Sequence, residues 1–234
     1  SNIVPWQLQA AKRGIALKVI PIDDSGNLLM DEYEKLFSDR TKIVSVAHVS
    51  NTLGTVNPVK DIVRIAHEHG VPVLVDGAQS TPHFKVDVQD LGVDFLAFSG
   101  HKMLAPMGIG VLWGKKKWLD AMPPFLFGGE MIQSVSREGA VYAEVPHKFE
   151  AGTVNAGGAV GLEAAIHYIA QIGFDRIRQR EEYLSTLMLE GIKKIPHVHL
   201  LGADTPEQHH GIFSFTVDDV HPHDVSAILA DAGI

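Results

Sequence analysis

The sequence predicts an α/β fold built on a mainly parallel sheet with helices on both faces. Apolar runs alternate with helical patterns through the first two thirds of the 234 residues. These runs are apolar throughout instead of alternating with polar residues, which is typical of strands buried on both sides. Hydrophobic residues make up 45% of the chain and charged residues 21%, so we expect a large buried core.

The expected elements follow one another in a regular order. Strands are expected at residues 17–22, 42–50, 71–77, 94–100 and 108–114. Helices are expected at 30–37 and 59–70. The first helix has acidic residues in its first turn, and the second is amphipathic and ends at a glycine, as helices commonly do.

The last third of the chain predicts a connector and a second, smaller domain. A glycine-rich stretch at 149–173 opens a helix after its small residues, and a highly charged helix follows at 174–195. Two strands and a helix come next, and we interpret them as the beginning of a small α+β C-terminal domain. The boundary is expected near Gly173, which gives a large domain over 1–173 and a connector with a partial small domain over 174–234.

Both ends of the sequence look cut. It starts at Ser1 without an initiator methionine, directly before an apolar run, and it stops at Ile234 just after the last helical pattern. We therefore interpret the chain as a piece of a longer protein.

Composition excludes several classes of function. The net charge of -8 argues against nucleic-acid binding, and the short basic run 115–117 is expected to be a solvated turn. No apolar run approaches the roughly 20 residues that span a bilayer, and no signal-peptide pattern opens the chain, so a cytoplasmic protein is expected. The chain has no cysteine, which excludes disulfides, thiolate metal sites and a thiol nucleophile within it.

Polar residues follow three of the expected strands, at the points where the apolar runs end. Ligands of open α/β sheets bind at the carboxyl edge of the strands, so these side chains should converge on one crevice. They are Asn51, Asp76, Gln79, Ser99, His101 and Lys102.

An acid and a lysine at such an edge suit pyridoxal 5'-phosphate (PLP). A carboxylate such as Asp76 favours the protonated pyridine nitrogen that makes the cofactor an electron sink, and Lys102 supplies an amine for its aldehyde. Gln79 could donate to the phenolic oxygen, and Ser99 and His101 could bind phosphate. Alone, each of these residues is more often a turn, cap or surface residue; together they form a specific pattern.

The motifs that carry these residues resemble a known family. "VLVDGAQSTPH", "DFLAFSGHKM" with "GIGVLWG", "GGEMI" and "FEAGTVN" are similar to the class V aminotransferase group of fold type I PLP-dependent enzymes. Within that group they resemble the SufS-like, group II cysteine desulfurases. The resemblance runs over essentially the whole chain and implies the large domain of that fold plus the start of its small domain.

The resemblance implies a role for each candidate residue. Lys102 would bind the cofactor covalently and move the substrate α-proton, and Asp76 would pair with the pyridine nitrogen. Gln79 would contact the phenolic oxygen, while Ser99 and His101 would contact the phosphate. His101 would also assist proton transfer.

Two further residues match the family pattern. Asn51, in "HVSNTLGTVNP", corresponds to an asparagine that contacts the cofactor and the substrate carboxylate. Thr153, in "FEAGT", corresponds to a threonine that reaches the phosphate of the neighbouring subunit. The resemblance therefore implies a homodimer with shared sites.

The implied activity is conversion of L-cysteine to L-alanine, with sulfur passed through an enzyme persulfide to a SufE- or SufU-type acceptor for iron-sulfur cluster assembly. In the family, the persulfide cysteine lies beyond the position where this chain stops at Ile234, so the chain alone is expected to be inactive. A selenocysteine lyase acting on L-selenocysteine, or a class V aminotransferase, is the alternative activity. A cofactor-free scaffold or binding protein of the same fold is the alternative that is not an enzyme.

The chain also departs from the usual group II pattern. Ala105 and Met107 stand where a glycine and a threonine are usual, and Phe127 replaces the first of three glycines before "EMI". We expect these changes to alter the turn or the dimer contact beside the site.

The histidine pairs are expected to be structural, with no metal site. The pair in "HEH" falls at a helix C-terminus, where the helix dipole favours histidine. "HPHD" at 221–224 is typical of an N-cap with proline in the first turn, and His209 and His210 are expected in an exposed loop.

Overall fold

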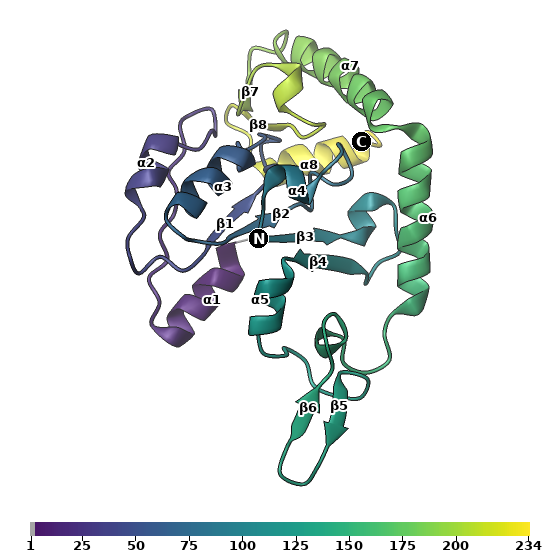
Figure 1. Cartoon of the computed structure of the whole chain (residues 1–234). Coiled ribbons are helices and arrows are strands. Elements are labelled where there is room, and N and C mark those ends of the chain that lie inside the picture. Colours follow the sequence, from purple (N-terminus) through teal and green to yellow (C-terminus); the bar gives the residue numbers. More distant parts are fainter. Residues whose placement is uncertain (1–2) are drawn as a thin grey trace.

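Four strands form the central sheet, in the order β1-β2-β3-β4 (Figure 1). The computed structural model describes residues 3–234. β1 (Val44–Ala47), β2 (Val73–Asp76) and β3 (Phe95–Ser99) run parallel, and β4 (Gly110–Gly114) is antiparallel to β3. The predicted α/β fold with a mainly parallel sheet is confirmed, and β4 can be antiparallel because a short turn, not a helical crossover, joins it to β3.

Helical crossovers set the direction of the first three strands. α3 (Val59–Glu68) joins β1 to β2, and the short α4 (Val88–Leu91) lies between β2 and β3. Asp76 pairs with Ala47 on one side and with Ala97 on the other. Because the strands are parallel and in register, their carboxyl ends meet at one edge of the sheet.

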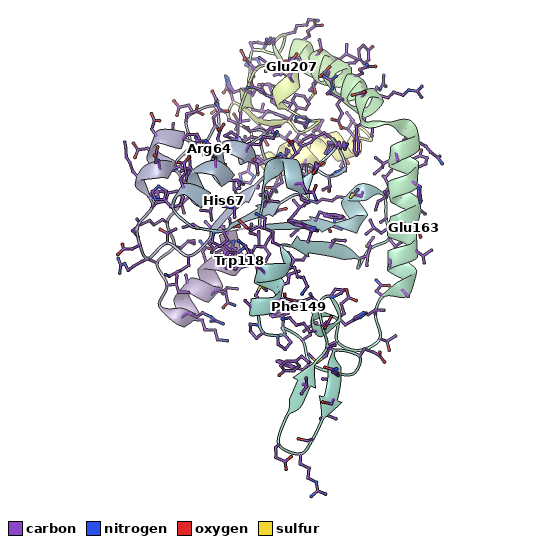
Figure 2. The ribbon with its side chains drawn as sticks, viewed as in Figure 1. Arg64, His67, Trp118, Phe149, Glu163 and Glu207 are labelled. Carbon is purple, nitrogen blue, oxygen red and sulfur yellow. The ribbon has the colours of Figure 1, made fainter. Side chains whose placement is uncertain are left out.

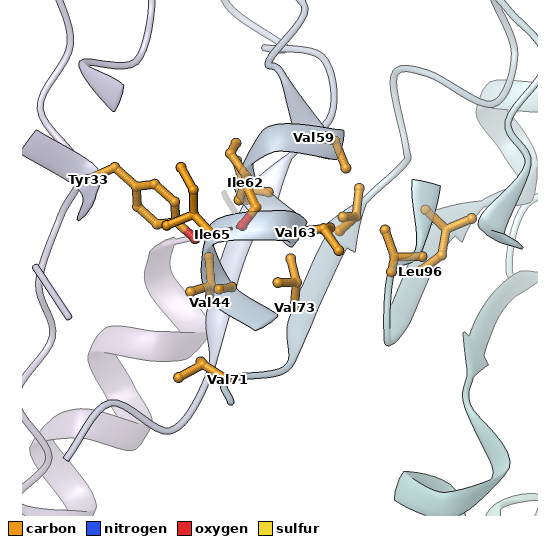
Figure 3. Packing of buried hydrophobic residues seen from close by; sticks show 13 residues of the cluster. Tyr33, Val44, Val59, Ile62, Val63, Ile65, Val71, Val73 and Leu96 are labelled. Carbon is orange, nitrogen blue, oxygen red and sulfur yellow. Dashed lines mark hydrogen bonds between the residues drawn. The ribbon is translucent and has the colours of Figure 1, made fainter. Parts of the chain in front are cut away.

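The main core lies between α3 and the sheet (Figure 3). Ile62 and Ala66 of α3 are fully buried, as are Val73 and Val75 of β2. Tyr33 of α2 (Met30–Lys35) packs there too, and its hydroxyl donates to the Ile62 carbonyl at 3.0 Å. Burial of these side chains is the dominant stabilising contribution to this part of the fold.

The other face of the sheet is less completely covered than the apolar runs predict. Buried and half-buried residues alternate along β1 and β2. On the half-buried face, Trp6 of α1 (Ile3–Arg13) donates from Nε1 to Ser45 Oγ at 3.0 Å. Residues in β4 are mostly exposed, so the expectation of strands buried on both faces holds only in part.

Asp94 joins several elements at the start of β3. Its carboxylate accepts hydrogen bonds from the Val73 amide, from Lys115 Nζ at 3.0 Å and from Trp118 Nε1, and it contacts His67 Nε2 at 2.7 Å. Figure 2 labels His67 on α3 and Trp118 on α5 (Lys116–Ala121). The basic run at 115–117 is therefore not simply a solvated turn, because Lys115 is half-buried on this carboxylate.

Some expected and observed elements differ. The predicted strand at 17–22 is wrong: Ile22 forms only an isolated bridge with Leu28, and Leu17 and Val19 are exposed. An apolar run becomes a strand only where a neighbour accepts its backbone hydrogen bonds. The sequence also missed α1, α4, α5 and a hairpin that projects from the body in Figure 1. The hairpin strands are β5 (Ile132–Val135) and β6 (Ala140–Tyr142).

The C-terminal third follows the predicted order of helix, helix, strand, strand, helix. The elements are α6 (Ala156–Ile172), α7 (Phe174–Ile192), β7 (Val198–Leu201), β8 (Ser214–Val217) and α8 (Pro222–Asp231). Gly173 separates the two long helices with a φ of 84°, a conformation that favours glycine. His221 is the N-cap of α8, where its side chain accepts from the His223 amide, so that expectation is confirmed. Across residues 3–234, no helix has the length and apolar character needed to cross a membrane.

Candidate active site

Asp76 is the last residue of β2 and lies at the carboxyl edge of the sheet. Its Oδ1 accepts a hydrogen bond from the Ala78 amide at 3.0 Å, so the side chain is oriented by the turn that follows the strand. The His48 amide donates to the Asp76 carbonyl at 2.9 Å, and the Gly77 amide donates to the Ala97 carbonyl. Backbone pairing on both sides therefore fixes where this half-buried carboxylate stands.

Gln79 lies in a compact turn directly after Asp76. The amides and hydroxyls of Ser80 and Thr81 all donate to the Gly77 carbonyl, at 3.0–3.2 Å. A Cβ on Gly77 would lie 2.9 Å from Leu96 Cδ1, so only a very small residue fits there. Burial of Ser80 and Thr81 anchors the turn and leaves Gln79 half-buried at the edge.

β3 runs beyond Asp76 and delivers the second group of candidates. Ser99 ends the strand, and the 3-10 helix η1 (Gly100–Met103) carries His101 and Lys102. Ser99 Oγ and His101 Nδ1 lie 2.8 Å apart and form a hydrogen bond. Lys102 is half-buried between the buried residues Gly100 and Met103, so the backbone around this lysine is anchored.

The chain then turns back into the sheet as β4. The Gly100 amide donates to the Ile109 carbonyl at 2.9 Å, and the Ala105 amide donates to the Gly100 carbonyl. A Cβ on Gly100 would lie 2.6 Å from Ile109 Cγ2, which explains the glycine. Leu104 takes the left-handed conformation with a φ of 65°, an unusual one for a leucine. The chain thus turns back between the two strands that the sequence predicts at 94–100 and 108–114.

The N-terminal part of α6 holds this turn in place. Asn155 caps the helix by accepting from the Gly158 amide, and its Nδ2 donates to the Gly108 carbonyl at 3.1 Å. Gly161 faces Pro106 so closely that an added Cβ would lie 2.5 Å from the proline ring. One helix end therefore supports the turn that follows Lys102.

Asn51 and Thr153 lie on exposed loops. Asn51 follows β1, in a turn where Ser50 Oγ accepts from the amides of Thr52 and Leu53. Thr153 lies between Gly152 and the start of α6. The Gly152 amide donates to the Gly129 carbonyl at 2.9 Å. The structure places Asp76, Gln79, Ser99, His101 and Lys102 along two neighbouring strand ends, but it does not tie Asn51 or Thr153 to them.

Two of the three residues that depart from the family pattern are strongly exposed, whereas Ala105 is half-buried. Met107 is 89% exposed and Phe127 is 72% exposed. Met107 lies in the turn held by α6, and Phe127 precedes the glycines whose backbone contacts Gly152. Neither side chain therefore packs into the core.

Sequence reasoning missed His48, which is buried beside Asp76. Burial, and secondarily the charge of His210, lower the pKa of His48 from 6.5 to about 4, so it is neutral at pH 7. Within residues 3–234 its Nδ1 has no hydrogen-bond partner, and its ring packs edge-on against Phe84 at 5.1 Å. The available signal was its position, directly after a strand and three residues before Asn51.

The expectation of an exposed loop at the second histidine pair is wrong. His209 is fully buried, with its Nδ1 3.0 Å from the Ile212 carbonyl and its ring stacked on Phe213. His210 is half-buried against Glu181 of α7. The polar sequence around the pair hid this burial: His209 is bonded and stacked within its own segment, while His210 packs on the distant Glu181 and Phe84.

Comparison with known proteins agrees with this geometry. Residues 1–234 match the family described as class-V aminotransferases. A probable cysteine desulfurase of Halalkalibacterium halodurans is 48% identical over 234 residues, which are 100% of this chain and 57% of that protein. The chain thus spans little more than half the length of this curated relative.

Solved structures show the same likeness. The cysteine desulfurase CsdA (S-sulfonic acid) from Escherichia coli has a TM-score of 0.92 at 35% identity, over 100% of this chain and 57% of that one. A C-DES mutant with glycine covalently linked to its PLP cofactor has a TM-score of 0.83 at 28% identity, over 99% of this chain and 62% of that one. The predicted resemblance is confirmed at the level of the family, while group II membership stays a prediction. By its match along the whole sequence and its fold, the chain belongs to the class-V aminotransferase family.

Proposed function

We propose that the whole protein is a PLP-dependent cysteine desulfurase that converts L-cysteine to L-alanine. The observation that carries this proposal is the pairing of neighbouring strands β2 and β3, which brings Asp76 and the Ser99–Lys102 group to one sheet edge. The names of the relatives support the same activity.

The residues at this edge fit PLP by their chemistry. Asp76 offers a carboxylate for the pyridine nitrogen and Lys102 offers an amine for the aldehyde. Ser99, with its hydrogen-bonded His101, offers donors for the phosphate. A lysine, an acid and phosphate donors on adjacent strand ends are the set that this cofactor needs.

When bound, PLP withdraws electrons from the substrate α-carbon and weakens its bonds. The Asp76 carboxylate would hold a proton on the pyridine nitrogen. Lys102 Nζ would hold the aldehyde carbon, and as a free amine it would accept the substrate α-proton. His101, which precedes Lys102 in the same turn, would assist this transfer.

The finer assignments belong to the same proposal. Asn51 would bind the substrate carboxylate, and Thr153 would reach the phosphate of a second subunit in a homodimer. Thr153 is exposed, as is Met107 in the turn that Asn155 binds through Gly108, so both are open to a second subunit. The sulfur would pass through a persulfide to a SufE- or SufU-type protein for iron-sulfur cluster assembly in the cytoplasm, with L-selenocysteine as an alternative substrate.

The first experiment tests the cofactor. The chain is expected to take up added PLP with a visible absorbance band from the lysine-bound form, and Lys102→Ala should abolish that band. Lys85→Ala, which removes an exposed lysine just beyond the Gln79 turn, is the matched control and should keep it. A chain that ignores PLP would contradict the enzyme proposal and favour a cofactor-free binding protein.

The second experiment tests the reaction in the full-length protein. Sulfide and L-alanine should form from L-cysteine. An α-keto acid without sulfide would instead identify an aminotransferase.

A further inference from the structure

Glu181, in the middle of α7, joins two segments that are far apart in the sequence. Its Oε1 accepts a hydrogen bond from His83 Nδ1, and its Oε2 lies 3.8 Å from His210 Nδ1. The three side chains are only 19%, 24% and 16% exposed, in the order Glu181, His83, His210. His83 lies at the end of the turn that carries Gln79, and His210 belongs to the segment before β8. The Glu181 carboxylate therefore bridges the candidate site and the C-terminal segment.

Aromatic contacts extend this group toward the sheet edge. The ring of Phe84 lies 5.4 Å from that of His210 and 5.1 Å from that of His48. We call His83, Phe84, Glu181 and His210 the Glu181 cluster. Because His48 also donates from its amide to the Asp76 carbonyl, the cluster packs against the same strand ends that hold the candidate site.

The Glu181 carboxylate is charged in this half-buried position. Burial raises its pKa, but favourable interactions with His210 and His83 outweigh burial and lower the pKa from 4.5 to about 2. A charged acceptor makes stronger hydrogen bonds than a neutral one. The contact with His83 is therefore a strong restraint on the turn.

The turn between Gly77 and Phe84 transmits that restraint. The amides of His83 and Phe84 donate to the Ser80 carbonyl at 3.0 and 3.1 Å, and Ser80 in turn is bonded to the Gly77 carbonyl. A shift of His83 therefore moves a chain of short hydrogen bonds that spans Gln79. Glu181 holds the far end of this unit, and Asp76 precedes its near end.

The C-terminal segment also packs on the loop that carries Asn51. A Cβ on Gly54 would lie 2.0 Å from the His209 carbonyl oxygen, so the two backbones are in direct contact. Ser214 Oγ donates to the Thr52 carbonyl at 2.6 Å. His209 and Ser214, which flank His210 in the sequence, thus contact the loop that carries Asn51, while His210 itself contacts Glu181.

We propose that Glu181 is a positioning residue of the candidate site. Through His83 it fixes the turn that presents Gln79, and through His210 it couples that turn to the segment that supports the Asn51 loop. The part of this inference that concerns the cofactor rests on the proposed function; the part that concerns the turn does not.

Hydrogen exchange and PLP binding test the two parts separately. In Glu181→Gln, the amides of His83 and Phe84 should exchange about tenfold faster without cofactor, as expected for loss of one hydrogen bond to a charged group. The dissociation constant for PLP should rise by a similar factor, with a changed absorbance spectrum. Glu182→Gln is the matched control: it removes the same charge one residue further along, where the partner is Arg178 at 3.2 Å, and both readouts should stay at the wild-type level.

A second variant keeps the test decisive if Glu181→Gln does not fold. His83→Asn removes the other partner, and it should produce the same faster exchange without adding to the effect of Glu181→Gln in the double variant. Unchanged exchange of the turn in a folded variant, with only a lower melting temperature, would overturn the proposal. If the wild-type chain binds no PLP while the turn still loosens, the proposed function falls and the positioning of the turn stands.

Discussion

The surroundings of single residues decide what each can do at this sheet edge. Lys102 is only half-buried, but Gly100 and Met103 on either side are buried, so the turn around it is held by packing. Asp76 is held by backbone pairing on both sides and by the Ala78 amide. The backbone at both positions is therefore fixed although the residues lie near the surface, as the proposed covalent cofactor site would require.

His48 gives a prediction at this scale. Its pKa falls from 6.5 to about 4 on folding, so the unfolded chain binds a proton between these pH values and the folded chain does not. The free energy of unfolding should therefore fall as the pH drops from 6.5 to 4, by up to about 3 kcal/mol from this residue.

In His48→Phe, urea unfolding at several pH values should show a shallower fall in unfolding free energy over this range. The Phe variant should keep wild-type stability at pH 7, because it also removes a buried nitrogen without a hydrogen-bond partner within residues 3–234. An identical pH profile in both proteins would contradict a buried, neutral His48.

Among whole elements, helix α6 supports the turn that follows Lys102, although the helix lies outside the sheet. Asn155 binds the Gly108 carbonyl, and Gly161 lies against Pro106. The close approach at Gly161 needs a residue without a side chain, although glycine lowers the stability of a helix.

Two glycines of α6 give a matched pair of variants. Gly161→Ala would place a Cβ 2.5 Å from the rigid Pro106 ring, so the turn must shift, and we expect a loss of about 1 kcal/mol or more in unfolding free energy. PLP uptake should weaken as well. Gly157→Ala meets nothing within 4 Å and should stabilise the chain by up to about 1 kcal/mol, because alanine favours helix. Equal gains from both substitutions in thermal unfolding would show that the contact with Pro106 is unimportant.

Asp94 links α3, β2 and α5 and gives a second prediction for elements. Burial raises its pKa, but hydrogen bonds from His67, Val73, Lys115 and Trp118 outweigh burial and lower the pKa from 3.8 to about 2. The stabilisation is present above pH 4 and should be lost as the pH falls toward 2, by about 2 kcal/mol.

Asp94→Asn should remove this acid-dependent loss and cost about 3 kcal/mol at pH 7, since its partners lose a buried charge. The exposed Asp90, paired with Lys60, supplies the control: Asp90→Asn should change unfolding free energy by less than about 1 kcal/mol. Comparable losses in the two variants would contradict a special role for the buried carboxylate.

At the scale of the whole molecule, the absence of cysteine limits the activity of the chain. No residue of the 234 can carry a persulfide. The chain is therefore expected to bind PLP but to release little or no sulfide from L-cysteine, whereas the full-length protein should release it. Methylene-blue detection of sulfide from both proteins checks this expectation. Rapid sulfide release by the chain itself would refute a cysteine-dependent mechanism.

The sequence predicts single residues of the candidate site better than it predicts contacts between distant segments. Asp76, Gln79, Ser99 and Lys102 follow apolar runs, and parallel pairing of those runs brings them together, so a local pattern was sufficient. The domain boundary near Gly173 stays a prediction. A helix break lies there, but beyond it His209 contacts Gly54 and His210 packs on Phe84, and both of these partners precede the break. Glu181 could not be found in advance, because its neighbours in sequence are charged and its partners lie on two distant segments.

The sequence by itself determined the α/β class, the order of most elements and the residues at the sheet edge. It could do so because burial periodicity, glycine turns and strand ends are local features of a chain. Only the tertiary structure decided that 17–22 is not a strand, that His48 and His209 are buried, and that Glu181 reaches the Gln79 turn. These outcomes depend on which distant surfaces meet, since a backbone pair, a buried ring or a charged contact needs a partner that the local sequence does not contain.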